Sequence, residues 1–254
     1  MYRSEWFDWD MLHFLKSYLQ PGDHFLDIGA NTGLHTLLAS TCIDPSAGGR
    51  ITCIEPDPSN VQRLRHALAV NHLDHVTVHP VAAAAHAGRV TLIGSDVFTR
   101  IASAVAGVCD PGAPEPPTTT RTKSALGSPN APQIDAIPLD DLLAETTRPI
   151  AACKIDVEGA EWEVLKGAQN LIKSGRLPLL ILELRGHLET FGSQESDFIT
   201  WLQAQGYHLA SYQHEKGQFS FTPPFPEDVF AISEAALETF RNRLPSADDN
   251  KHEQ

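Results

Sequence analysis

The sequence has few basic residues. Its 19 lysines and arginines stand against 32 aspartates and glutamates, which gives a formal net charge of −13. Proteins that bind nucleic acid through its phosphates need a basic surface, and so do proteins held at a membrane by a polybasic patch. The shortage of basic residues therefore argues against a nucleic-acid partner and against a membrane partner.

Long apolar runs and cysteine pairs are missing as well. No apolar run approaches the roughly 18 residues of a membrane-spanning helix. The four cysteines are scattered and form no Cys-x-x-Cys pair, which disfavours a zinc site and a disulfide framework. The segment Met1–Trp6 holds acidic and aromatic residues where a signal peptide would need a basic and then an apolar region. We therefore expect a reduced protein of the cytoplasm.

The residues that are present indicate one domain. A chain of 254 residues with 42% hydrophobic content can bury one large core or two small ones. We interpret residues 1–245 as a single domain and expect the polar residues 246–254 to form a disordered tail. Between residues 94 and 133 the periodic pattern gives way to prolines among small and polar residues. Such a stretch cannot build a core, so we predict a flexible insertion or lid there.

The stretch that organises the chain is Phe25–Gly33, with the sequence FLDIGANTG. An apolar run ends in Asp27 and is followed by Gly29, Gly33 and a helical apolar pattern. This order predicts a buried strand, a tight turn and a helix start, the arrangement with which α/β folds bind nucleotides. The two glycines would let the backbone approach a ligand without a Cβ in the way. Asp27, at the end of the strand, could accept a hydrogen bond from the ligand.

Further buried strands alternate with helical segments along the chain, which predicts a mostly parallel sheet with right-handed crossovers. These strands are expected over residues 51–54, 76–78, 90–93, 151–156, 179–182, 207–212 and 229–232, and a strand-like run begins at Ile134. The last two are expected to form a hairpin at the edge of the sheet. Ligands bind at the carboxyl ends of the strands in such sheets, where Asp27, Glu55, Asp156 and residues 183–187 fall.

Two of these positions suit parts of a nucleotide. Glu55 follows the second strand about 20 residues beyond the glycines, where a carboxylate can bind both ribose hydroxyls. Ala82 begins a run of small residues against which an adenine ring could pack; the alternative is a tight strand exit without a ligand role.

Two motifs resemble known methyltransferase signatures. The stretch from Asp27 to Gly33, together with Glu55, is similar to the S-adenosylmethionine signature of class I methyltransferases. The run Lys154–Ala168, KIDVEGAEWEVLKGA, closely resembles the signature of the FkbM-type methyltransferase family. This resemblance implies a Rossmann-like class I methyltransferase, an α/β fold with a seven-stranded, mostly parallel sheet. It also implies an antiparallel C-terminal strand and helices on both faces of the sheet.

The same resemblance implies a function. It implies S-adenosyl-L-methionine as the cofactor and methylation of a carbon- or nitrogen-borne hydroxyl on a small natural product or sugar-type metabolite. The family's cofactor positions carry over to Asp27, Gly29, Asn31, Gly33, Glu55 and Asp156. The long insertion departs from the family pattern and leaves the size of the substrate open.

Methyl transfer to a hydroxyl depends mainly on alignment and exclusion of water, which can contribute about 7–11 kcal/mol. A positioned base adds roughly 10²–10⁴-fold. His187 is the first candidate for this base because it follows a predicted strand and imidazole titrates near neutrality; the alternative is a surface histidine. Glu158 could act as the base or orient the acceptor, or it could cap a helix whose first turn holds Glu161. Asp156 and Glu158 could also bind Mg²⁺, but without a third evident ligand we expect no metal.

Other functions remain open at this point. A catalytically inactive, cofactor-binding scaffold would keep the same fold, although the intact glycines and Glu55 favour a working cofactor site. A nicotinamide-dependent dehydrogenase would also place an acid after the second strand, but the spacing D-x-G-x-x-x-G differs from G-x-G-x-x-G. The identity of the acceptor and the oligomeric state, including a homodimer, lie beyond the sequence.

Overall fold

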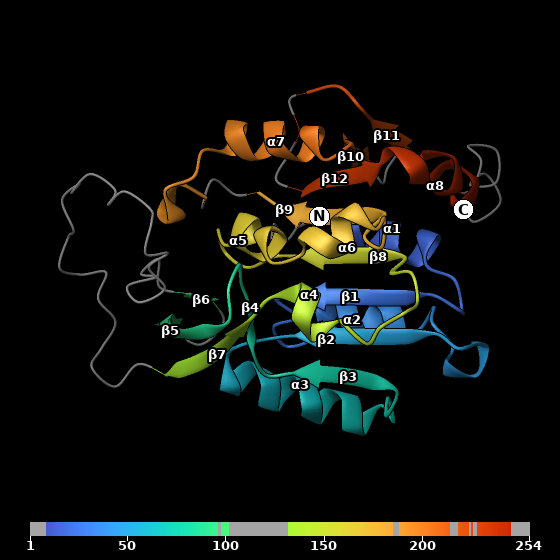
Figure 1. Cartoon of the computed structure of the whole chain (residues 1–254). Coiled ribbons are helices and arrows are strands. Elements are labelled where there is room, and N and C mark those ends of the chain that lie inside the picture. The colour runs from blue at the N-terminus through green and yellow to red at the C-terminus, as the bar shows by residue number, and fades with distance from the viewer. Residues whose placement is uncertain are drawn as a thin grey trace, which may run out of the picture.

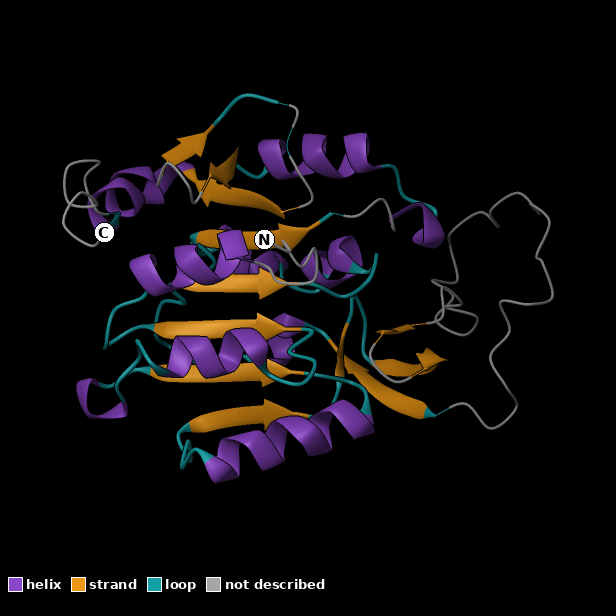
Figure 2. Cartoon of the chain, turned by 180° about the vertical axis from the view of Figure 1, so that it is seen from behind, coloured by secondary structure: helices purple, strands orange, loops and turns teal. Residues whose placement is uncertain are grey.

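The computed structural model describes residues 9–95, 98–101, 132–184, 188–213, 218–223, 225 and 228–244. A sheet of eight strands forms the centre, and helices cover both of its faces (Figures 1 and 2). The strand order is β11-β10-β12-β9-β8-β1-β2-β3. The strands are β1 (His24–Ile28), β2 (Arg50–Ile54), β3 (Val76–His79), β8 (Ala152–Ile155), β9 (Leu179–Glu183), β10 (Tyr207–Gln213), β11 (Gln218–Ser220) and β12 (Asp228–Ser233).

The direction of the strands confirms the predicted fold class. Strands β3, β2, β1, β8 and β9 are parallel, whereas β12 is antiparallel to both β9 and β10. These seven strands form the expected mostly parallel core with an antiparallel C-terminal strand. β12 lies between β9 and β10, and β10 and β12 form the predicted hairpin. One detail differs from the prediction: the short strand β11 forms the edge of the sheet by pairing with β10.

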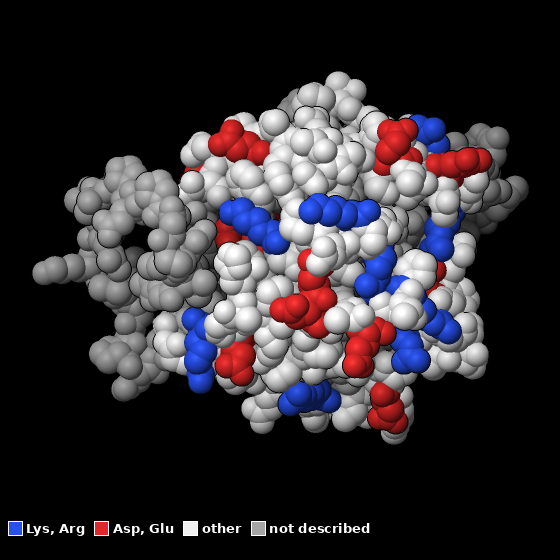
Figure 3. Space-filling view, in the orientation of Figure 1, with Lys and Arg blue, Asp and Glu red and all other residues white. Residues whose placement is uncertain are grey.

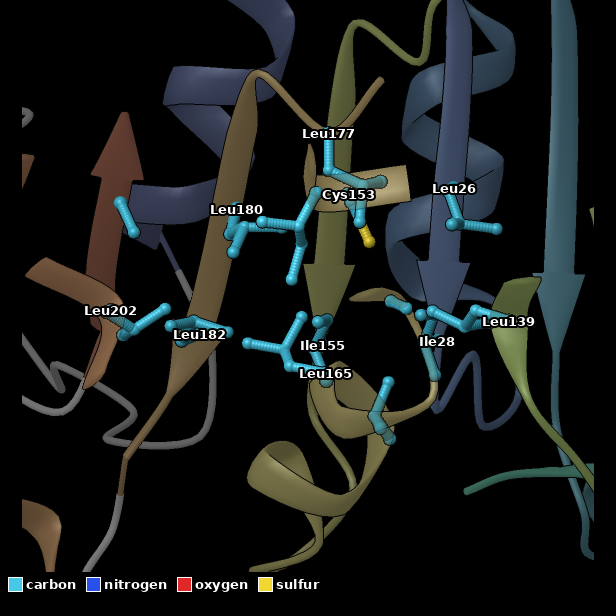
Figure 4. Close-up of a cluster of buried hydrophobic side chains, with 14 of the residues drawn as sticks. Leu26, Ile28, Leu139, Cys153, Ile155, Leu165, Leu177, Leu180, Leu182 and Leu202 are labelled. Atoms are coloured by element: carbon cyan, nitrogen blue, oxygen red, sulfur yellow. The ribbon is translucent and has the colours of Figure 1, made fainter. Parts of the chain in front are cut away.

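Two hydrophobic cores form because successive side chains of each strand point to opposite faces of the sheet. Leu26 and Ile28 of β1 belong to one core, shown in Figure 4 with residues of β8 and β9, whereas Phe25 belongs to the other. The first core packs against α4 to α7, and the second against α1 to α3 and α8. The helices are α1 (Trp9–Tyr18), α2 (Leu34–Ser40), α3 (Pro58–Val70), α4 (Leu139–Leu142), α5 (Glu161–Lys166), α6 (Gln169–Lys173), α7 (Glu195–Ala204) and α8 (Leu237–Arg243).

Local sequence explains where some helices begin. Asp57 caps α3 by accepting backbone N–H bonds from Ser59 at 2.7 Å and Asn60 at 3.1 Å. Pro58 occupies the first helical position, where its missing N–H group costs no hydrogen bond. Short 3₁₀ helices also occur at η1 (Pro45–Ala47), η3 (Leu188–Phe191) and η4 (Glu234–Ala236).

A second, four-stranded sheet lies beyond the carboxyl ends of the parallel strands (Figures 1 and 2). Its order is β4-β7-β5-β6, from β4 (Ala82–Ala83), β5 (Gly88–Ser95), β6 (Phe98–Ile101) and β7 (Gln133–Ile137). The sequence had indicated no strand between 94 and 133, and β6 corrects this: Phe98-Thr99-Arg100-Ile101 is a short run of aromatic and β-branched residues that pairs with β5. The insertion over 102–131 and the tail over 246–254 lie outside the described residues.

In the part of the chain that the structure describes, no helix is long and apolar enough to cross a membrane. Cys42, Cys53 and Cys153 are free thiols.

The aromatic side chains under α1 provide a test of the second core. Phe14 is completely buried, and its ring centroid lies 4.8 Å from that of Phe230 and 5.0 Å from that of Tyr18. We expect Phe14→Ala to lower the free energy of unfolding by about 3–5 kcal/mol, measured by chemical denaturation. The control Val70→Ala, at a position that is 63% exposed, should change it by less than about 0.5 kcal/mol. A small effect of Phe14→Ala would contradict this packing.

Candidate functional site

The candidate site is the edge of the large sheet where β1, β2, β8 and β9 end. Ile28 lies in register with Ile54 of β2 and Ile155 of β8. Beyond this level, the N–H of Gly29 donates to the carbonyl of Ile54 at 2.9 Å, and the N–H of Asp156 donates to that of Ile28 at 3.1 Å. The structure therefore brings together the chain segments that carry most of the predicted site residues.

The predicted turn after β1 has a backbone that requires glycine. Gly29 has a φ of +75° and Gly33 a φ of +100°, and Asn31 between them also lies in the left-handed region at +50°. A Cβ on Gly29 would lie 1.7 Å from the carbonyl oxygen of Asp156, and one on Gly33 would lie 2.5 Å from Leu64. The glycines thus allow close packing of protein against protein, in addition to the approach of a ligand that the sequence suggested.

Glu55 connects this turn to the segment after β2 through hydrogen bonds of its carboxylate. One of its carboxylate oxygens accepts the N–H of Asn31 at 2.8 Å, and the other accepts the N–H of Asp57 at 2.9 Å. The residue is 4% exposed, and this burial raises the pKa of its carboxyl group. Oε1 also accepts the side-chain amide of Asn60 at 3.5 Å, whereas Oε2 keeps a second lone pair that can accept a ribose hydroxyl.

Asp27 has a different environment from the one expected. It lies inside β1 and is completely buried, because this central strand is covered on both faces. Its Oδ2 accepts the hydroxyl of Thr36 on α2 at 2.7 Å, and its Oδ1 lies 3.6 Å from Nζ of Lys154. The carboxylate is therefore turned to internal partners and not to the surface, where we had expected it to meet a ligand.

Lys154 is a residue of this site that sequence reasoning missed. Its Nζ donates to the carbonyl of Gly29 and to the carboxylate of Asp156, both at 3.1 Å. Burial of Asp156 favours its neutral form, but the charge of Lys154 and hydrogen bonds with Glu183 and Lys154 together outweigh burial and lower the pKa of the carboxyl group. The available signal was a lysine within an apolar strand, since a buried ammonium group needs a carboxylate partner.

Glu161 is the second residue that was missed, because the sequence placed it only in the first turn of a helix. It is 1% exposed, and one carboxylate oxygen accepts the N–H groups of Val157 and Gly159, each at 3.1 Å. Burial raises the pKa of its carboxyl group to about 7. The loop that it holds contains Glu158 with a φ of +56° and Gly159 with a φ of +104°.

A depression of about 220 Å³, partly open to solvent, lies over this loop. It is lined by Asp156, Glu158, Gly159, Glu161, Glu183, Leu184 and Leu188. Two of the predicted catalytic residues, Asp156 and Glu158, therefore share one cavity. The third, His187, lies outside the described residues.

Two further predictions concern adenine and metal binding. Ala82 is buried in β4, where it pairs with Ala136 of β7, and it does not line the depression. Its contact with adenine therefore stays a prediction. Within the described ranges, no three His, Cys, Asp or Glu side chains are grouped so that they could hold a metal ion.

Comparison with protein families identifies the chain. The family model described as the methyltransferase FkbM domain matches residues 27–209. The chain belongs to this family. The resemblance in the motifs around Asp27 and Lys154 is thereby confirmed. No curated protein matches the chain significantly.

Several solved structures are similar to this chain at low sequence identity. The FkbM methyltransferase of Methylobacillus flagellatus is 16% identical with a TM-score of 0.49; the match covers 85% of this chain but 47% of that one. A provisionally assigned rRNA methylase of Clostridium thermocellum is 9% identical with a TM-score of 0.50, over 88% of this chain and 92% of that one. Fibrillarin of Aeropyrum pernix, solved with S-adenosyl-L-methionine, is 13% identical with a TM-score of 0.45, over 87% and 73%.

The chain thus spans about half the length of the Methylobacillus protein. Identities this low relate the folds and carry no information about the acceptor.

The buried carboxyl group of Glu161 predicts a dependence of stability on pH. Its pKa rises from 4.5 to about 7 on folding, so the folded protein binds this proton more tightly than the unfolded chain does. The resulting stabilisation is complete below about pH 4.5 and is lost as the pH rises through 7. Glu161→Gln keeps an acceptor oxygen without the charge, so it should be more stable than the wild type at pH 8 by on the order of 1–3 kcal/mol.

Chemical denaturation at pH 5 and pH 8 measures this effect. The advantage of Glu161→Gln should shrink at pH 5, while Glu145→Gln, at an exposed position, should show no such change between the two pH values. An equal advantage at both pH values would mean that the carboxyl group does not titrate in this range.

Proposed function

We propose that the protein transfers the methyl group of S-adenosyl-L-methionine to a hydroxyl group of a small molecule. The observation that carries this proposal is the depression beside the glycine turn, which combines carboxylates with the side chains of Leu184 and Leu188. Small-molecule sites in proteins have this mixed character, with a few polar groups fixing orientation against an apolar wall.

In this proposal the turn from Gly29 to Gly33 binds the cofactor and Glu55 accepts its ribose hydroxyls. The fit rests on the left-handed backbone at Gly29 and Gly33, where no side chain blocks the ligand, and on the remaining lone pair of Glu55 Oε2. Asp156, beside the turn, is proposed to contact the cofactor, and Ala82 is proposed to pack against its adenine. The bound cofactor would supply an electrophilic sulfonium methyl group.

The protein's own residues then have to align the acceptor and take up a proton. The acceptor oxygen forms the new bond to the methyl carbon, the bond from sulfur to that carbon breaks with its electrons going to sulfur, and the hydroxyl proton leaves. We propose Glu158 as the group that receives the proton, since it lines the depression, whereas the carboxylate of Asp156 is already bound by Lys154. His187, the first candidate from the sequence, is the alternative base.

A small acceptor is favoured over nucleic acid. The chain carries a net charge of −13, and on the face shown in Figure 3 basic side chains alternate with acidic ones. A surface of this kind gives little attraction for a phosphate backbone.

Cofactor binding is tested by thermal unfolding with S-adenosylhomocysteine, S-adenosylmethionine or NAD(H). A ligand at 100 times its dissociation constant should stabilise the protein by about 2.7 kcal/mol, and we expect this of the two adenosyl compounds only. Glu55→Ala should weaken S-adenosylhomocysteine binding by tenfold or more, because it removes the ribose contact, whereas exposed Asp141→Ala should not. A shift with NAD(H) alone would favour a dehydrogenase. No shift with any ligand would contradict the proposed cofactor site and favour a scaffold that has also lost cofactor binding.

Turnover separates the two candidate bases. With labelled cofactor and a panel of hydroxylated metabolites, Glu158→Gln should lower kcat by roughly 10²–10⁴-fold and change S-adenosylhomocysteine affinity by less than about twofold. His187→Ala, measured in parallel, should retain turnover if Glu158 is the base. The opposite pattern would transfer the role to His187, and labelling of added ribosomal RNA instead of the metabolites would overturn the small-molecule acceptor.

A further inference from the structure

Lys154 is buried more completely than its charge would lead one to expect. It lies in β8, at the centre of the large sheet between β1 and β9, and is 1% exposed. Removing an ammonium group from water costs several kcal/mol unless carboxylates and hydrogen bonds replace its hydration. An apolar residue would meet the packing needs of this strand at lower cost, so a lysine here calls for a specific explanation.

The contacts of Nζ suggest that explanation. The ammonium group donates to the carbonyl of Gly29 in the turn after β1 and to the carboxylate of Asp156 after β8, both at 3.1 Å. It also lies 3.6 Å from the carboxylate of Asp27. The ammonium group thus connects the turn after β1, which is 125 residues away from Lys154 along the chain, with the segment after β8, and both segments reach the candidate cofactor site.

The carboxylates around Lys154 determine its protonation state. Burial by itself would lower the pKa of the ammonium group, but the carboxylates of Asp156 and Asp27 outweigh burial and hold that pKa above its usual value. Lys154 therefore stays charged. Its charge compensates Asp27 within the core, while the side chain of Asp156 remains 27% exposed at the edge of the sheet.

The network also reaches the helix that follows the turn. The second oxygen of Asp27 accepts the hydroxyl of Thr36 on α2 at 2.7 Å. Lys154 therefore holds the turn through the carbonyl of Gly29. The hydrogen bond between Asp27 and Thr36 joins the strand before the turn to the helix after it. Glu55 holds the same turn from the neighbouring strand through the N–H of Asn31.

We propose that Lys154 is a positioning residue for the cofactor turn: by holding the Gly29 carbonyl and the Asp156 carboxylate, it sets the shape that receives S-adenosylmethionine. This inference rests on the proposed cofactor site. Lys154 does not itself need to touch the cofactor, and its effect passes through the two groups that it binds.

The test uses two variants of the full chain. Lys154→Met removes the ammonium group at similar length, but it leaves the Asp27 carboxylate buried without a cation, so it is expected to lose stability. The double variant Lys154→Met/Asp27→Asn removes both charges, and the amide oxygen that replaces the carboxylate can still accept the Thr36 hydroxyl. Each protein is measured for thermal stability, for S-adenosylhomocysteine affinity by calorimetry, and for KM and kcat.

We expect the double variant to recover most of the melting temperature that Lys154→Met loses, yet to bind S-adenosylhomocysteine at least tenfold more weakly than the wild type. The kinetic loss should appear mainly in KM for S-adenosylmethionine. Lys166→Met, at an exposed lysine of α5, should leave these quantities unchanged. Recovery of both stability and affinity in the double variant would show a purely structural role and overturn the proposal.

Two further results have defined meanings. Asp27→Asn alone should lose less affinity than the double variant, and an equal loss would assign the effect to Asp27 instead of Lys154. If the wild type itself fails to bind S-adenosylhomocysteine, the proposed cofactor site fails, which is a different result from any difference among the variants.

Discussion

The geometry of the site depends on how closely the turn after β1 approaches the end of β8. The Gly29 backbone and the Asp156 carbonyl are so close that no side chain fits between them. Directly beside this contact, the buried Lys154 ammonium binds the Gly29 carbonyl and the Asp156 carboxylate. The close backbone contact and the Lys154 hydrogen bonds therefore involve the same two residues, Gly29 and Asp156. A substitution that disturbs Gly29 or Asp156 would move the turn relative to β8.

Around this contact, carboxylates are used largely to hold backbone. Glu55 accepts N–H groups from the two turns that follow β1 and β2, and Glu161 accepts N–H groups within the loop that follows β8. Backbone N–H groups in such loops have no partner in a helix or sheet, so buried carboxylates satisfy them and fix the loop conformation. A site of this kind is shaped before a ligand arrives, which reduces the ordering that binding requires.

Much of this arrangement was predictable from the sequence. Buried apolar runs that alternate with helices require a parallel sheet, and this requirement alone places Asp27, Glu55 and Asp156 toward one edge. The direction in which each side chain points was not predictable in the same way. Asp27 turns inward because its cation comes from Lys154, a partner far along the chain that no local pattern reveals.

Other differences have similar causes. The sequence placed Glu161 only in the first turn of a helix, but the left-handed backbone at Glu158 and Gly159 directs the loop's N–H groups toward it. The strands β6 and β11 were missed because each is only a few residues long and exists through pairing with a neighbour. Sequence patterns indicate which residues reach an edge, whereas contacts between distant segments decide what each residue does there.

The central claim is that the turn after β1 and the carboxylate of Glu55 together bind the adenosyl cofactor. A crystal structure of the full chain with S-adenosylhomocysteine tests it most directly. The account predicts that the ligand lies against the turn, with its ribose hydroxyls within hydrogen-bonding distance of Glu55 and its sulfur facing the depression over Glu158. A ligand bound elsewhere, or a ribose without contact to Glu55, would contradict it.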